Sequence, residues 1–151
     1  MNNWEHLNTQ QVGQFGEYFV KMELTKAGLS VFGAEVDDRG IDFVTRTDAG
    51  NHYDVQVKTV RNLNYVYCRK QVFKISEQML LALVLLTEDE HPDLYLIPST
   101  AWLSPNALFC DRDYVDKKSA PEWGLNLSAK NMPLLEVFKF HATIARLTDS
   151  D

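Results

Sequence analysis

This sequence has no long apolar run, no recognisable secretion signal and only two cysteines. Its longest apolar run, Met79 to Leu86, has eight residues, whereas a helix needs about 20 apolar residues to span a bilayer. The first residues are polar and contain no basic stretch of the kind that opens a signal peptide. The two cysteines, Cys68 and Cys110, have no metal-binding spacing. We therefore expect a cytoplasmic protein with no membrane partner and with reduced, inert thiols.

Repeats, low-complexity tracts and linkers are also missing. The chain has 151 residues, of which 45% are hydrophobic and 24% charged, an ordinary composition for a soluble globular domain. That length suits one well-buried core better than two. We predict a single domain over residues 1–151, with a core at about 9–98 and a C-terminal extension at 99–151.

Acidic residues are absent from one segment of an otherwise acidic chain. The net charge is −6, yet the segment from Lys58 to Ser76 contains no Asp or Glu. Its basic residues are Lys58, Arg61, Arg69, Lys70 and Lys74. Such a segment is typical of a phosphate-binding surface, so we expect the last four to bind nucleic acid. The alternative is an ordinary solvated surface with scattered basic residues.

The residues 40–44 and 54–58 form the most informative stretch. Both segments alternate apolar and polar residues, and turn-forming residues separate them, so they predict a β-hairpin. Asp54, Gln56 and Lys58 share one face of the second strand. A three-residue loop would pair Asp42 with Lys58 on that face, whereas a two-residue loop would put Asp42 on the opposite face. The sequence is compatible with both registers.

A helix at residues 9–27 precedes this hairpin. Gln11 is placed to form a capping box with Asn8, and the predicted apolar stripe consists of Val12, Phe15, Phe19 and Met22. Gly13 and Gly16 inside the helix each cost about 1 kcal/mol relative to Ala. Close approach of the helix to a sheet would offset that cost. Glu17 follows one turn after Gly13 on the same side.

The rest of the chain alternates strands and short helices, which predicts an α/β fold with a mixed sheet. We expect strands at 29–36, 64–69, 81–86 and 94–97, and a turn at 37–40. The strand at 81–86 is apolar throughout, so both its faces should be buried. Further predictions are a short helix at 75–80, a helical turn at 99–103, a loop at 111–122, an edge strand at 123–127 and a last helix capped by Asn131.

The order of these parts resembles a known family. Gly-Ile-Asp-Phe-Val at 40–44, a hairpin, Gln-Val-Lys at 56–58 and a preceding helix with Gly-Glu at 16–17 resemble the core of the PD-(D/E)xK nuclease superfamily. The resemblance covers roughly residues 12 to 88 and points to the branch of Holliday-junction resolvases and Mrr-type nucleases, and to small uncharacterised domains with Gln-x-Lys. It implies a restriction-endonuclease-like domain, a mixed β-sheet flanked by helices.

The resemblance also implies an activity and its residues. The protein would be a Mg²⁺-dependent (or Mn²⁺-dependent) DNA endonuclease in repair, recombination or defence. Its metal ligands would be the Asp42 carboxylate, the side-chain carbonyl of Gln56, the backbone carbonyl of Val57 and the Glu17 carboxylate. Lys58 would orient the attacking water or stabilise the phosphate in the transition state.

Two departures from the family pattern keep alternatives open. Gln56 stands where most relatives have Glu, which removes one negative charge from the metal site, and Ile41 stands where the motif name has Pro. Asp54, on the same strand face, is a candidate replacement for the missing Glu. One alternative is an inactive nuclease-fold module that binds nucleic acid or a protein partner; another is an unrelated α/β binding or scaffold domain. A junction-type enzyme would act as a homodimer, because one small domain cuts one strand at a time.

Overall fold

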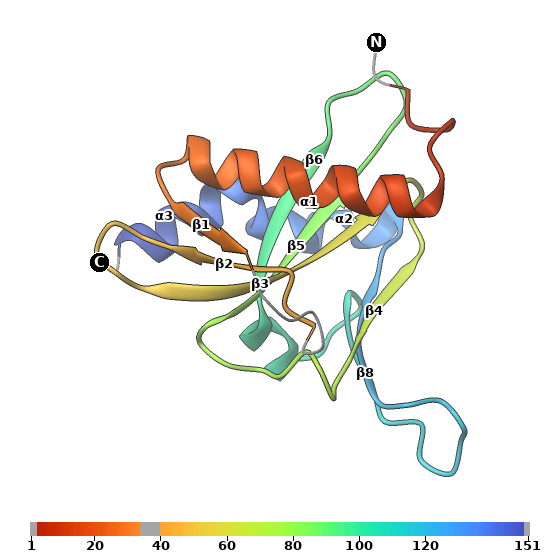
Figure 1. Cartoon of the computed structure of the whole chain (residues 1–151). Helices are drawn as coiled ribbons and strands as arrows, with labels where there is room; N and C mark the ends of the chain where they lie inside the picture. Colours follow the sequence, from red (N-terminus) through yellow and green to blue (C-terminus); the bar gives the residue numbers. More distant parts are fainter. Residues whose placement is uncertain (1–2, 34–39, 150–151) are drawn as a thin grey trace.

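The computed structural model describes residues 3–33 and 40–149, and these residues form three layers (Figure 1). Helices α1 (Thr9–Lys26) and α3 (Phe140–Asp149) pack on one face of a five-stranded sheet. A three-stranded sheet packs on its other face. None of the helices in the described ranges is long and apolar enough to cross a membrane.

The five-stranded sheet has the order β1-β2-β3-β5-β6. Its strands are β1 (Ser30–Gly33), β2 (Phe43–Arg46), β3 (His52–Val60), β5 (Met79–Leu85) and β6 (Asp93–Pro98). Strands β3 and β5 are parallel and all other neighbours are antiparallel, so the predicted mixed sheet is confirmed. Part of the predicted strand at 29–36 and most of the predicted turn at 37–40 lie outside the described residues.

The three-stranded sheet has the order β4-β8-β7. Its strands are β4 (Tyr65–Arg69), β7 (Phe109–Arg112) and β8 (Glu122–Asn126). The prediction of an edge strand at 123–127 is wrong, because β8 is the central strand. The predicted loop at 111–122 overlaps the end of β7, whose buried Phe109 lies opposite the buried Leu125 of β8.

Strand β5 explains the longest apolar run of the chain. All seven of its residues are buried, as predicted. Leu80, Ala82 and Val84 join the core beneath the helices, and Leu81 and Leu83 join the core between the two sheets. The alternation of side chains along a strand thus places apolar groups in both cores, and the polar face of the neighbouring β3 points to the same side as Leu81 and Leu83.

Helix α1 begins with the predicted capping box between Asn8 and Gln11. Its buried residues are Val12, Gly16, Val20 and Leu24. Phe15 and Phe19 of the predicted apolar stripe are partly buried and pack against the core, whereas Met22 is 60% exposed and its place in the stripe is wrong. The predicted close approach of the helix to the sheet occurs at Gly16, which is buried against Thr59.

Several short elements differ from the sequence prediction. The predicted helix at 75–80 is wrong, because Ser76 N–H donates to Ser99 Oγ and β5 begins at Met79. The predicted turn at 99–103 is the 3-10 helix η1 (Ser99–Leu103). The last predicted helix is divided, and its parts are η2 (Ala129–Asn131), α2 (Met132–Leu135), η3 (Glu136–Phe138) and α3.

Candidate functional site

The register of the β2–β3 hairpin places Asp42 on the same side as Gln56. Phe43 lies opposite Val55, and the N–H of Asp42 donates to the carbonyl of Val55 at 2.9 Å. The numbers of paired residues therefore sum to an even value, and this register places Asp42 opposite Gln56. Residues 47–51 connect the two strands, so the loop is longer than the two-residue and three-residue loops considered above.

The carboxylate of Asp42 is fixed by the backbone of β3. Its Oδ2 accepts a hydrogen bond of 2.7 Å from the N–H of Val57. Strand β2 begins only at Phe43, so the side chain of Asp42 occupies the position where a further residue of β2 would pair. A carboxylate that accepts from a backbone N–H is held in a defined orientation, which is what a metal ligand requires.

Gln56 carries a polar atom that the described protein does not satisfy. The residue is half-buried, its Oε1 is fully buried, and no group in the described part of the chain donates a hydrogen bond to it. A buried acceptor without a donor is costly and requires an explanation such as a bound water or ion. An amide oxygen is also a normal ligand of Mg²⁺. The donor types at Asp42 and Gln56 thus fit a divalent cation.

Lys58 follows Gln56 on the same strand face. It is half-buried, and none of the ion pairs among the described residues includes its ammonium group. Burial raises the pKa of the Cys68 thiol to about 11, while the charge of Lys58 opposes this rise and that of Asp42 adds to it. The charges of Asp42 and Lys58 thus both act on Cys68, a residue that sequence reasoning did not assign to the site.

A groove separates β3 from β4, and we call it the β3–β4 groove. Its volume is about 460 Å³. The lining residues are Gln56, Lys58, Val60, Tyr65, Val66, Tyr67, Cys68, Arg69 and Val72. Sequence reasoning missed the two tyrosines as site residues, although their alternation at positions 65 and 67 placed them on one face of a predicted strand.

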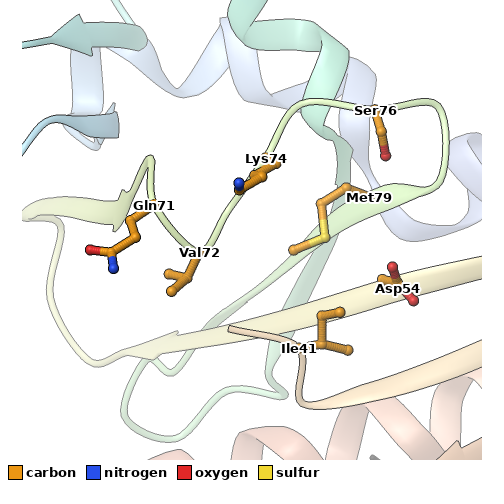
Figure 2. Close-up of a pocket in the computed structure, with 7 residues that line it drawn as sticks. All are labelled: Ile41, Asp54, Gln71, Val72, Lys74, Ser76 and Met79. Atoms are coloured by element: carbon orange, nitrogen blue, oxygen red, sulfur yellow. The ribbon is translucent and has the colours of Figure 1, made fainter. Parts of the chain in front are cut away.

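A second pocket adjoins this groove at Val72, which lines both. The pocket has a volume of about 490 Å³, and Figure 2 shows Val72 and Lys74 on the loop after β4, across from Asp54 on β3. Its other lining residues are Ile41, Gln71, Ser76 and Met79. Asp54 therefore lines the neighbouring pocket, while Gln56 and Lys58 line the groove.

Glu17 lies on α1, which covers the face of the sheet opposite to Gln56 and Lys58. Its carboxylate forms an ion pair of 3.1 Å with Lys21. Across residues 3–33 and 40–149, no three His, Cys, Asp or Glu side chains are close enough together to hold a metal ion. A cation at Asp42 would therefore depend on the amide of Gln56 and on backbone oxygen.

The four basic residues predicted to bind nucleic acid have different surroundings. The guanidinium of Arg61 donates to the carbonyls of Trp4 and Leu7, at 3.0 and 2.8 Å. Lys70 forms ion pairs with Asp111 and with Asp113, the latter at 2.6 Å. Arg69 and Lys74 are exposed.

Comparison with known proteins gives structural matches only. No protein-family model matches the sequence, and neither does any curated protein. The Holliday junction resolvase Hjc of Archaeoglobus fulgidus superimposes with a TM-score of 0.50 at 14% identity, over 81% of this chain and 88% of the resolvase. A bacterial homing endonuclease superimposes with a TM-score of 0.57 at 17% identity, over 95% of this chain and 99% of the endonuclease. The chain therefore has the restriction-endonuclease-like fold of the PD-(D/E)xK nucleases.

Proposed function

We propose that this protein is a Mg²⁺-dependent DNA endonuclease whose site consists of Asp42, Gln56 and Lys58. The observation that carries the proposal is the buried Oε1 of Gln56, which receives no hydrogen bond from the described residues and lies on the strand opposite Asp42. The shared fold with a resolvase and a homing endonuclease supports this assignment. Cleavage of both strands of a duplex would require two copies of the chain, as in a homodimer.

The candidate ligands of the cation are those implied by the motif. Asp42 would supply a carboxylate, Gln56 its side-chain carbonyl and Val57 its backbone carbonyl. When bound, Mg²⁺ or Mn²⁺ supplies a Lewis acid that lowers the pKa of water and neutralises charge on phosphate. Glu17 stays a ligand that the motif alone implies, because it lies on the helix that covers the opposite face of the sheet and its carboxylate is paired with Lys21.

Lys58 would act on the phosphate. Its half-buried ammonium group lies in the groove beside Gln56, where a charge interacts more strongly than in bulk water. A cation placed there stabilises the negative charge that develops as the phosphodiester bond is hydrolysed. Removing it should therefore lower turnover more than DNA binding.

A non-cutting DNA-binding module is the second candidate function. It is favoured by the lack of a three-member carboxylate, His or Cys cluster among the described residues. Nicking of supercoiled plasmid with Mg²⁺ or Mn²⁺ separates the two. We expect nicking by the wild type, none by Asp42→Asn, and for Lys58→Met a strongly reduced turnover with a much smaller loss of DNA affinity.

Asp54→Asn is the matched control for these variants. Asp54 is an acid on the same strand face, but it lines the adjoining pocket, so this variant should keep its activity if Gln56 is the ligand. Equal loss in Asp54→Asn would assign the missing carboxylate to Asp54. If the wild type cuts no DNA with either metal while binding it, the endonuclease proposal is wrong and the binding module replaces it.

A further inference from the structure

Two tyrosines of β4, Tyr65 and Tyr67, are among the residues that line the β3–β4 groove, and they form a stacked pair. Tyr65 and Tyr67 are two residues apart on one strand, so their rings lie on the same face. Their ring centroids are 6.1 Å apart and the ring planes differ by 21°. Tyr67 is 44% exposed, which is a large aromatic exposure for a residue in a paired strand.

Tyr65 is held in place from three sides. Its hydroxyl donates to the buried carboxylate of Glu122, and the guanidinium of Arg112 lies 4.3 Å from the ring centroid. Gly124 provides the space, since a Cβ at that position would lie 2.0 Å from the Tyr65 hydroxyl. The ring of Tyr65 is therefore held by several contacts, and the ring of Tyr67 stacks on it.

Ordinary sheet packing accounts for Tyr65 and leaves Tyr67 unexplained. Side-chain contacts between neighbouring strands stabilise antiparallel sheets, and the Tyr65 hydroxyl reaches along β8 to Glu122, four residues from its register partner Asn126. Tyr67 lies opposite Gly124, which has no side chain to pack against it. An exposed ring stacked on a fixed one resembles the platforms on which single-stranded nucleic acids place their bases.

The charges around the tyrosines suit a nucleic-acid strand. Lys58 and Arg69 line the same groove, and Arg112 lies on the ring of Tyr65. The nearby acids Asp111 and Asp113 are paired with Lys70. A groove that combines basic side chains with aromatic rings binds a single strand through its phosphates and its bases together.

We propose that Tyr67, supported by the ring of Tyr65, stacks unpaired bases at the β3–β4 groove, so that the substrate is DNA containing a single-stranded segment. The inference rests on the proposed function for the identity of the site as a DNA site. It adds the structural class of the substrate. In this arrangement the stacked bases would position the adjoining backbone beside Lys58.

Binding in EDTA tests this inference without any cleavage. Fluorescence anisotropy would compare a labelled single strand of about 16 nucleotides with the blunt duplex of the same sequence. Base–aromatic stacking is worth about 1–3 kcal/mol per base, so Tyr67→Ala should weaken single-strand binding by about 5- to 150-fold. Duplex binding should change less than about twofold, and Tyr67→Trp should restore single-strand binding.

Tyr18→Ala is the matched control, because Tyr18 is 56% exposed on α1 and should have no effect on single-strand binding. The inference is overturned if Tyr67→Ala binds the single strand like the wild type, if it loses duplex binding equally, or if Tyr18→Ala behaves the same way. Thermal melts confirm that each variant is folded. If the protein prefers the single strand but cleaves no DNA with any metal, only the endonuclease proposal is wrong. If it cleaves DNA but shows no preference for the single strand, only this inference is wrong.

Discussion

The carboxylate of Asp42 takes the place of a strand partner for Val57, whose N–H donates to Asp42 Oδ2 at 2.7 Å. The Asp42 side chain thus supplies the acceptor for the N–H of Val57, and it is also the acid of the proposed site. Asp42→Ala should lower the free energy of unfolding by about 1–3 kcal/mol, because the N–H of Val57 loses its acceptor. Asp42→Asn keeps an acceptor and should cost less, although both abolish nicking. Urea unfolding measures the difference, and equal costs would contradict this role of the hydrogen bond.

Gln56→Glu should make stability depend more on Mg²⁺. A second carboxylate near Asp42 adds like-charge repulsion without metal and adds a charged ligand with it. We expect a lower melting temperature in EDTA than for wild type and a larger upward shift on adding Mg²⁺, with nicking retained or increased. Gln71→Glu, in the neighbouring pocket, is the control. A Mg²⁺ response no larger than that of the control would argue against a cation at Gln56.

The two glycines of α1 should respond oppositely to alanine. A Cβ at Gly16 would lie 1.7 Å from Thr59 Oγ1 and 2.8 Å from Thr59 Cβ, whereas nothing lies within 4 Å of a Cβ at Gly13. Gly16→Ala should therefore destabilise by about 1–3 kcal/mol through overpacking. Gly13→Ala should stabilise by about 0.5–1 kcal/mol, because alanine favours the helix. Denaturant unfolding of both variants checks this, and a stabilising Gly16→Ala would contradict the observed helix–sheet contact.

The sequence predicted the parts of this site that depend on local pattern. Alternation along 54–58 placed Gln56 and Lys58 on one face, and the apolar run at 81–86 predicted a strand buried on both faces; both hold in the structure. The register was undecided because it depends on the closure of residues 47–51, where the N–H of Thr47 donates to the carbonyl of Asn51 at 2.9 Å.

What the sequence did not reveal comes from contacts between distant segments. Strand β8 pairs with β4 across more than fifty intervening positions, so neither its central place nor the Tyr65–Glu122 hydrogen bond leaves a local signal. Helix α1 was predicted only in part for a related reason. Its glycines indicated a close approach to the sheet, which occurs at Gly16, but no pattern within the helix identifies Thr59 of β3 as the contact.

The salt dependence of DNA binding should distinguish two adjacent basic residues. Arg69 is exposed in the groove, while Lys70 is paired with Asp111 and Asp113. Arg69→Ala should lower the slope of log affinity against log salt by about 0.9 for duplex DNA, or about 0.7 for a single strand. Lys70→Ala should change it less, because two acids already neutralise that ammonium. A salt titration measures both slopes, and equal losses would show that Lys70 leaves its acids to bind phosphate.

Stability should fall in alkaline solution through the buried thiol of Cys68. Burial raises its pKa from 9.0 to about 11, so between these values the unfolded chain releases a proton that the folded chain retains. The folded state then binds more protons, and stability falls as pH rises. By pH 11 the loss should be on the order of 2 kcal/mol. Cys68→Val removes this contribution. A smaller decline in stability should remain above pH 10, because burial also raises the pKa of Tyr95 to about 12. Urea unfolding at pH 8 and at about pH 10.5 compares the two proteins, and parallel declines would show that the Cys68 thiol is not the group responsible.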